Sequence, residues 1–203
     1  MFFIAHRINN LDPESFPEAD GIEFDVRDSN GRIIVTHDPF TEGQPLEDFL
    51  YFCPPEKFYI VNIKSEGIEL KILQLLKEYS IKNFFFLDCS IPMMVKLGKQ
   101  YTTNLAVRYS EYESIETVKK MAHLVEWVWI DTFTKIPLTQ EQEQELHSLG
   151  LKLCFVSPEL QGQQSKVDQY IQDLENKQIK LDAVCCKTQF IDAWRSATSL
   201  DPN

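Results

Sequence analysis

Three features are scarce in this sequence: long apolar runs, closely spaced cysteine pairs and positive charge. Apolar runs such as Phe84–Leu87 and Trp127–Ile130 are far shorter than the roughly 20 residues that a membrane span requires, so we expect no transmembrane segment. The opening residues, Met1–His6, place no basic region ahead of an apolar stretch, so we expect no secretion signal. Both observations lead us to expect a cytoplasmic protein.

The cysteines and the charge balance narrow the class further. The five cysteines show neither CxxC spacing nor a histidine pair suited to zinc, which favours reduced, buried thiols in the cytoplasm. Lys and Arg total 20 against 31 Asp and Glu, a formal net charge of −11. Because such a surface on average repels a polyanion, we expect no nucleic-acid partner.

The chain does contain enough apolar residues for a sizeable core. Its 203 residues, 43% of them hydrophobic, predict one domain over residues 1–203. Short β-rich runs recur, and most precede a segment with helical apolar spacing, as in βα units. The predicted strands are Phe2–His6, Gly21–Val26, Phe58–Lys64, Phe84–Cys89, Leu105–Tyr109, Trp127–Asp131, Leu151–Val156 and Ala183–Lys187. The predicted helices are 45–51, 67–79, 91–100, 111–122, 139–149, 164–178 and 190–198.

Eight predicted parallel strands favour a small closed (β/α)8 TIM-type barrel of the α/β class, although 203 residues is short for a fold that typically takes about 250. An open doubly wound sheet is the alternative, but no glycine-rich phosphate loop follows the first strand. Residues 8–20 have room for little more than one helical turn, because prolines interrupt them. The pair Asn30-Gly31 predicts a β-hairpin that extends the second strand.

Every predicted strand ends in polar side chains, and a barrel brings all these ends to a single mouth. Strand side chains alternate, so Glu23 and Asp25 share one face. Two carboxylates held together repel unless a cation lies between them, and carboxylates with waters and a substrate phosphate usually hold Mg²⁺. The pair indicates a hard divalent metal or, alternatively, two solvated acids at an exposed edge. Arg108 and Lys187 end two further strands, where each binds phosphate or forms ion pairs.

Two histidines favour the metal interpretation. His6 ends the first strand and His37 follows the hairpin, and two histidines beside a carboxylate pair provide an acid and a base near neutral pH. The strand parity also places Asn62 beside Lys64 on one face. The polar groups at the predicted mouth therefore suit proton transfer beside a charged substrate.

Four short segments combine these polar residues into a pattern. They are Ile4–Arg7, Gly21–Asp28, Asn30–Pro39 and Val61–Lys64. In order, they carry a His-Arg pair, a Glu-x-Asp pair, a hairpin and a His-Asp pair. This pattern resembles the glycerophosphodiester phosphodiesterase family, one of the phosphatidylinositol-phospholipase-C-like barrels. The resemblance covers residues 3–39 and 60–67, and beyond these only the alternation of strands and helices agrees.

The resemblance implies roles for seven residues. It implies that His6 and His37 are the catalytic acid and base, and that Arg7 and Lys64 bind the substrate phosphate. It also implies that Glu23, Asp25 and Asn62 bind Mg²⁺ or Ca²⁺. The family has an acid at the position of Asn62. Because an amide brings no charge, we expect weaker metal binding in the absence of substrate.

We therefore expect a metal-dependent phosphodiesterase that cleaves a small-molecule or lipid-linked phosphodiester, by hydrolysis or through a cyclic phosphate. One alternative is a catalytically silent barrel that binds a phosphorylated ligand, which the exchange at Asn62 would suit. Another is a structural or assembly protein with a polar rim. His6 and His37 argue against both, because neither needs a general acid and base. The alcohol beside the phosphate, whether a lipid, a sugar or a polyprenyl carrier, stays open.

Overall fold

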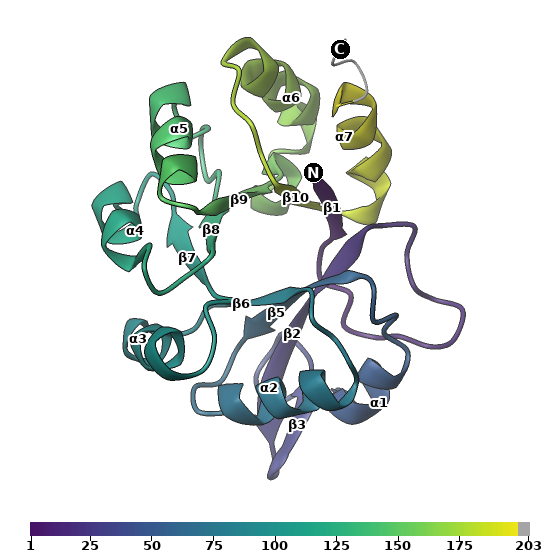
Figure 1. The fold of residues 1–203 in the computed structure, drawn as a ribbon. Helices are drawn as coiled ribbons and strands as arrows, with labels where there is room; N and C mark the ends of the chain where they lie inside the picture. The colour runs from purple at the N-terminus through teal and green to yellow at the C-terminus, as the bar shows by residue number, and fades with distance from the viewer. Residues whose placement is uncertain (199–203) are drawn as a thin grey trace.

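The computed structural model of the protein describes residues 1–198, and a ring of parallel strands lies at its centre (Figure 1). The strands of the ring are β1 (Phe2–Ala5), β2 (Gly21–Ser29), β5 (Phe58–Ile63), β6 (Phe84–Leu87), β7 (Ala106–Tyr109), β8 (Trp127–Ile130), β9 (Lys152–Val156) and β10 (Ala183–Cys186). Parallel pairing joins β1 to β2, β2 to β5, β5 to β6, β7 to β8, β8 to β9, β9 to β10 and β10 back to β1. β6 and the start of β7 meet at a single bridge between Phe86 and Leu105. The predicted small (β/α)8 barrel is thus confirmed, and the open sheet is wrong.

Helices surround the ring on its outside (Figure 1). They are α1 (Leu46–Tyr51), α2 (Glu69–Glu78), α3 (Ile91–Gln100), α4 (Ile115–Met121), α5 (Gln140–Ser148), α6 (Val167–Asn176) and α7 (Ile191–Thr198), and each lies at a predicted position. Short 3-10 turns, η1 (Pro158–Gln161), η2 (Gln164–Lys166) and η3 (Thr188–Phe190), lie ahead of α6 and α7. The first connection is different, because residues 6–20 form a loop without a helix.

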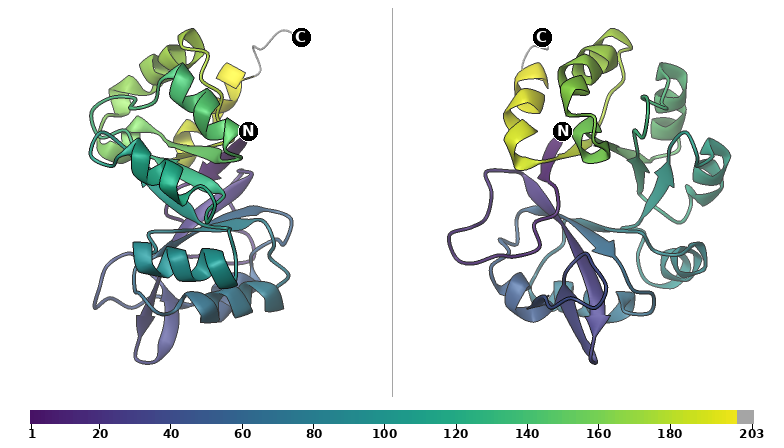
Figure 2. Two further views of the ribbon diagram at one scale, coloured as in Figure 1. Left: turned by 60° about the vertical axis from the view of Figure 1, so that its left-hand side comes forward. Right: turned by 180° about the vertical axis from the view of Figure 1, so that it is seen from behind.

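A β-hairpin extends the second strand of the ring, as predicted. β2 runs on and turns at Asn30 and Gly31, whose φ angles of 49° and 77° suit a two-residue turn with both residues left-handed. β3 (Arg32–Val35) returns antiparallel to β2, and Figure 2 shows the hairpin projecting from the barrel. A further short strand, β4 (Gln44–Pro45), pairs with β3 and was not predicted from the sequence. The chain between the hairpin and β5 is therefore anchored at the same edge.

Buried apolar side chains fill the inside of the ring. On β5, Ile60 belongs to this inner cluster, whereas Val61 packs in the outer core between strands and helices. Because strand side chains alternate, Asn62 and Lys64 project on the same side as Ile60, nearer the carboxyl end. The inner cluster is thus the floor of the barrel mouth, and polar side chains lie above it.

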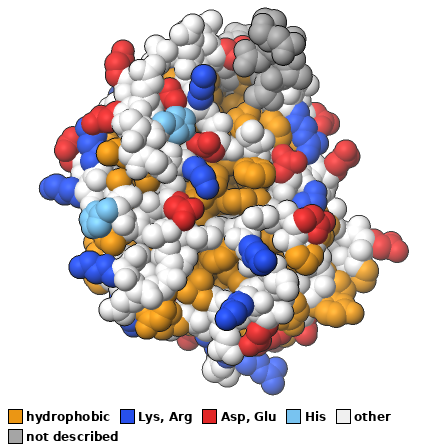
Figure 3. All heavy atoms as spheres, in the orientation of Figure 1, with side chains coloured by type: hydrophobic (Ala, Val, Ile, Leu, Met, Phe, Trp, Pro, Cys, Tyr) orange, Lys and Arg blue, Asp and Glu red, His pale blue; other side chains and the backbone are white. Residues whose placement is uncertain are grey.

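All five cysteines are buried, as expected, and their thiols are free. Within residues 1–198, no helix has the length and apolar character needed to cross a membrane. On the face seen in Figure 3, hydrophobic side chains gather near the middle, and acidic and basic side chains are interspersed around them. That face therefore carries a mixture of charges rather than a field of one sign.

Candidate active site

A buried pair of carboxylates lies at the barrel mouth. Glu23 and Asp25 on β2 are each 1% exposed, and they point into the ring because Phe24 between them packs in the outer core. Glu23 accepts hydrogen bonds from the backbone N–H of Arg7 at 2.7 Å and from Nδ2 of Asn62 at 2.8 Å. The pairing of β2 with β1 and β5 brings these three strand ends together.

The second carboxylate is held by an amide and two cations. Nδ2 of Asn9 donates to Oδ2 of Asp25 at 2.8 Å, and the backbone N–H of Asp25 donates to Oδ1 of Asn9, also at 2.8 Å. Nζ of Lys64 lies 3.5 Å from Oδ1 of Asp25, and Nε of Arg7 lies 3.8 Å from Oδ2. Asn9 was not predicted from the sequence, because it lies in a loop without periodicity. Its contact with Asp25 depends on how that loop folds.

Burial makes the charged state of Glu23 unfavourable. It raises the pKa of Glu23 to about 7, and the nearby charge of Asp25 raises it as well, against hydrogen bonds from Asn62 and Arg7. A positive charge beside both carboxylates would favour their ionised forms. The pair is therefore suited to a cationic partner.

His6 lies against this pair as a neutral base. Its Nε2 is 3.7 Å from Oε2 of Glu23. Burial lowers the pKa of His6 to about 4, and the positive charges of Arg7 and Lys187 lower it as well. A neutral imidazole can accept a proton at physiological pH.

His37 is positioned by the end of the hairpin. The backbone N–H of the preceding Thr36 donates to the carbonyl oxygen of Asp25 at 3.0 Å, which holds this turn at the mouth. Nδ1 of His37 is 2.7 Å from Oδ1 of Asp38. Because a carboxylate only accepts, Nδ1 carries the proton, and Nε2 is left for proton exchange. The positive charges that lower the pKa of His6 include that of His37.

Two site residues adopt a backbone conformation that side chains disfavour. Arg7 has a φ of 54° and Asp88, after β6, a φ of 64°, and non-glycine residues rarely take this left-handed region. Such residues cluster at functional sites, where the surrounding structure holds them in place. At Arg7 the backbone N–H meets Glu23, and at Asp88 the side chain meets two cations.

A row of alternating charges extends from the pair across the mouth. Nζ of Lys64 donates to Oδ2 of Asp88 at 2.9 Å, and Nε of Arg108 donates to Oδ1 of Asp88 at 2.7 Å. A second guanidinium nitrogen of Arg108 donates to the buried carboxylate of Asp131. Arg108 therefore forms ion pairs, one of its two predicted roles, and its role in binding phosphate stays a prediction. Lys187 is exposed at the end of β10, and its role in binding phosphate stays a prediction.

The donors of the site fit a divalent cation. Oδ1 of Asn62 is buried and has no hydrogen-bond partner within residues 1–198. With the carboxylates of Glu23 and Asp25 it offers hard oxygen ligands, which Mg²⁺ and Ca²⁺ prefer. Among the described residues, no group of three His, Cys, Asp or Glu side chains is arranged to hold a metal ion.

The protein belongs to the class of (β/α)8 barrels, because a ring of parallel strands is surrounded by helices and ends in a polar mouth. Neither a protein-family model nor a curated protein matches the chain, whereas solved structures match over nearly its whole length. Two structures from Agrobacterium tumefaciens superpose with TM-scores of 0.69 and 0.66 at 14% and 13% sequence identity. They cover 98% and 95% of this chain, and 99% of each of those chains is covered.

The second of these structures is a glycerophosphodiester phosphodiesterase. Another, from Thermotoga maritima, superposes with a TM-score of 0.60 at 18% identity, covering 96% of this chain and 97% of that one. A glycerophosphoryl diester phosphodiesterase from Parabacteroides distasonis has a TM-score of 0.62 at 12% identity, covering 99% of this chain and 87% of that one. At such low sequence identity, these superpositions establish a shared fold and nothing beyond it. The resemblance seen in the sequence is confirmed at that level.

Proposed function

We propose that the protein is a divalent-metal-dependent phosphodiesterase with His6 and His37 as its acid and base. The observation that carries the proposal is the buried pair of Glu23 and Asp25, with His6 and Lys64 beside it at the barrel mouth. The shared fold with solved phosphodiesterases supports it. The substrate is a small-molecule or lipid-linked phosphodiester, and the five free thiols suit a cytoplasmic location.

The cationic groups of the mouth bind the phosphate in this mechanism. Lys64 and Arg7 form charge-assisted hydrogen bonds with the phosphoryl oxygens, which are stronger than bonds between neutral groups. Glu23, Asp25 and Asn62 hold the metal, which when bound stabilises the charge on those oxygens. The apolar floor below the mouth keeps these charges in an environment where each acts more strongly than in water.

The two histidines carry the proton transfers. Nε2 of one accepts the proton of the attacking hydroxyl, which belongs to water or to the substrate itself. Nε2 of the other donates a proton to the departing alcohol oxygen as the ester bond breaks. Asp38 is a positioning residue that holds the ring of His37 through Nδ1. Proton exchange with water then restores both histidines.

The experiment measures metal-stimulated cleavage of bis(p-nitrophenyl) phosphate with Mg²⁺ or Ca²⁺. We expect His6→Ala and His37→Ala each to lower kcat by about 10²- to 10⁴-fold, the usual contribution of a positioned proton-transfer group, while metal affinity stays nearly unchanged. The matched control is His123→Ala, which removes an exposed histidine after α4, at the end of the barrel away from the mouth.

Three outcomes decide the matter. Full activity in His6→Ala or His37→Ala would remove that histidine from the mechanism. A loss of the same size in His123→Ala would mean that the assay reports folding rather than chemistry. A wild-type protein that binds phosphate esters but cleaves none with either metal would favour the catalytically silent barrel instead.

A further inference from the structure

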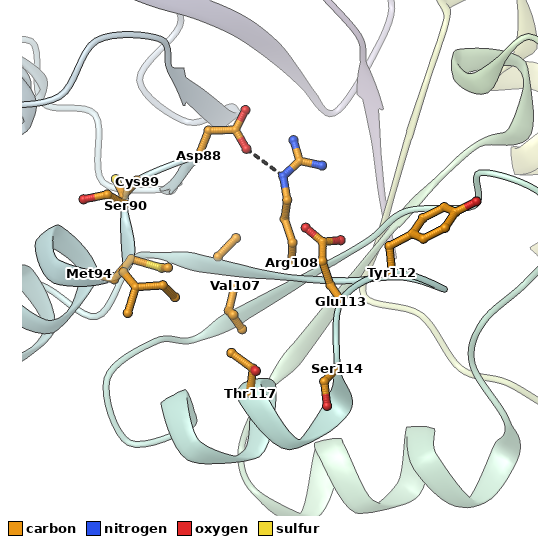
Figure 4. A pocket seen from close by; sticks show the side chains of 12 residues that line it. Asp88, Cys89, Ser90, Met94, Val107, Arg108, Tyr112, Glu113, Ser114 and Thr117 are labelled. Atoms are coloured by element: carbon orange, nitrogen blue, oxygen red, sulfur yellow. Dashed lines mark hydrogen bonds and ion pairs between the residues drawn. The ribbon is translucent and has the colours of Figure 1, made fainter.

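A pocket opens beside the row of charges, between α3 and α4 (Figure 4). Its volume is about 670 Å³, in the range of sites that hold drug-sized ligands. Met94 of α3 and Thr117 of α4 line it on either side of Val107 of β7. The pocket lies at the seam where β6 and β7 share only one bridge. It therefore extends the barrel mouth outward between two helices.

The inner surface of this pocket is apolar. Met94, Ala106 and Val107 are 5%, 2% and 3% exposed, and all three line the pocket. The hydroxyls of Ser90 and Ser114 also line it, but they accept hydrogen bonds from backbone N–H groups as the N-caps of α3 and α4. More of the lining surface is apolar than polar, so burial of apolar surface would stabilise an occupant.

Within residues 1–198, the charged groups at the edge of the pocket leave no free cation. Among the described residues that line the pocket, Arg108 is the only cation, and Asp88 and Asp131 both occupy its guanidinium. Oε2 of Glu113, a further lining residue, accepts a hydrogen bond from Oγ of Ser110 at 2.7 Å. An anionic group would meet Asp88 and Glu113 without a free cation, so its transfer from water is unfavourable.

One residue joins the pocket to the phosphate-binding region. Asp88 lines the pocket and accepts a hydrogen bond from Nζ of Lys64 at 2.9 Å. A phosphate bound at Lys64 would therefore lie close to the entrance of the pocket. We propose that this pocket binds an alcohol substituent of the substrate, and that the substituent is an uncharged hydrocarbon group larger than glycerol. The inference rests on the proposed phosphodiesterase function for the position of the phosphate.

The test titrates the protein with methyl, butyl and octyl phosphate in the presence of Mg²⁺ and measures Kd by calorimetry. Each buried methylene strengthens binding by about fourfold, so butyl phosphate should bind up to about 60-fold more tightly than methyl phosphate. Thr117→Phe places a ring in the pocket and should bring this ratio close to unity. The control, Lys120→Phe, adds the same ring at an exposed position of α4 that is not part of the pocket, and should keep the wild-type ratio.

A second pair of probes tests the charge of the occupant. Choline phosphate and 3,3-dimethylbutyl phosphate have the same shape, but only the first carries a positive charge in its alcohol group. We expect tighter binding of the neutral compound. Tighter binding of choline phosphate would overturn the inference in favour of a cationic alcohol held by Glu113.

Turnover measured in parallel separates this inference from the proposed function. A wild-type ratio near unity for methyl and butyl phosphate, with active cleavage of bis(p-nitrophenyl) phosphate, overturns the pocket assignment alone. A strong dependence on chain length without cleavage supports the pocket and contradicts the phosphodiesterase proposal. A cooperative thermal unfolding transition would show that Thr117→Phe is folded. The loss of the Kd ratio between methyl and butyl phosphate would then report the filled pocket.

Discussion

Replacement of Asn62 by aspartate tests whether three oxygen ligands face one cation. Nδ2 of Asn62 donates to Oε1 of Glu23 at 2.8 Å, and Asn62 is 7% exposed. Asn62→Asp removes this hydrogen bond to a charged group, which contributes about 1.5–3 kcal/mol. It also adds a carboxylate beside Glu23 and Asp25, and two charges about 4 Å apart at an effective dielectric constant of about 20 repel by about 4 kcal/mol. The free energy of unfolding without metal should therefore fall by several kcal/mol.

These energies translate into a measurable shift of the melting temperature. In a chain of this size 1 kcal/mol corresponds to about 2–4 °C, so Asn62→Asp should unfold at least about 5 °C below wild type in EDTA. Saturating Mg²⁺ or Ca²⁺ should reverse the difference, because the third charge tightens binding to the folded state. Each tenfold gain in metal affinity adds about 1.4 kcal/mol of stability. Circular dichroism gives Tm, and calorimetry gives the affinity.

The matched control adds the same charge away from the site. Asn83→Asp changes an exposed asparagine ahead of β6 and should leave both the Tm in EDTA and the response to metal close to wild type. The reasoning would be refuted if Asn62→Asp melted like wild type in EDTA and gained nothing further from Mg²⁺ or Ca²⁺. That result would mean that Asn62 does not face the ion.

The remaining predictions concern the cations of the mouth and one histidine outside it. Lys64→Met should raise KM in steady-state assays by about 10- to 100-fold, because a hydrogen bond to a charged group contributes about 1.5–3 kcal/mol; unchanged kinetics would exclude a contact with phosphate. Arg108→Met should lower the free energy of unfolding in urea by about 3–5 kcal/mol, because it leaves a buried carboxylate unpaired; an unchanged midpoint would contradict the ion-pair role. Burial lowers the pKa of His147, but hydrogen bonds to Asp182 and Glu143 outweigh burial, so the pKa is raised. The protonated His147 should therefore stabilise the fold below pH 6.5, and this stabilisation should be lost as pH rises through the folded-state pKa. The Tm of His147→Gln should therefore differ from wild type at pH 6 more than at pH 9, and equal differences would contradict this linkage.

The acid pair shows what local patterning can predict about the site. In a strand, successive side chains point to opposite faces whatever the rest of the chain does. The alternation of Glu23 and Asp25 with Phe24 was therefore enough to place both acids on the inner face. The turn at Asn30-Gly31 was predictable for a similar reason, because few residue pairs tolerate two left-handed conformations.

Other parts of the site depend on contacts between segments distant in sequence. Asn9 reaches Asp25 only because a loop without periodicity folds back onto β2. The pairing of β4 with β3 involves two residues, too short a segment for a hydrophobic pattern to reveal. Asp88 was recognisable as a strand end, but its ion pairs with Lys64 and Arg108 follow from the order of strands around the ring.

The sequence by itself determined the eight strands, the helices between them and the faces on which Glu23, Asp25, Asn62 and Lys64 lie, because these follow from short-range periodicity. Only the tertiary structure decided the ionisation of Glu23 and His6, since their pKa values depend on burial and on charges from other strands. The ion pairs of Arg108 and the pocket between α3 and α4 were decided in the same way. Ring closure places these groups side by side, and no local pattern in a single segment encodes that proximity.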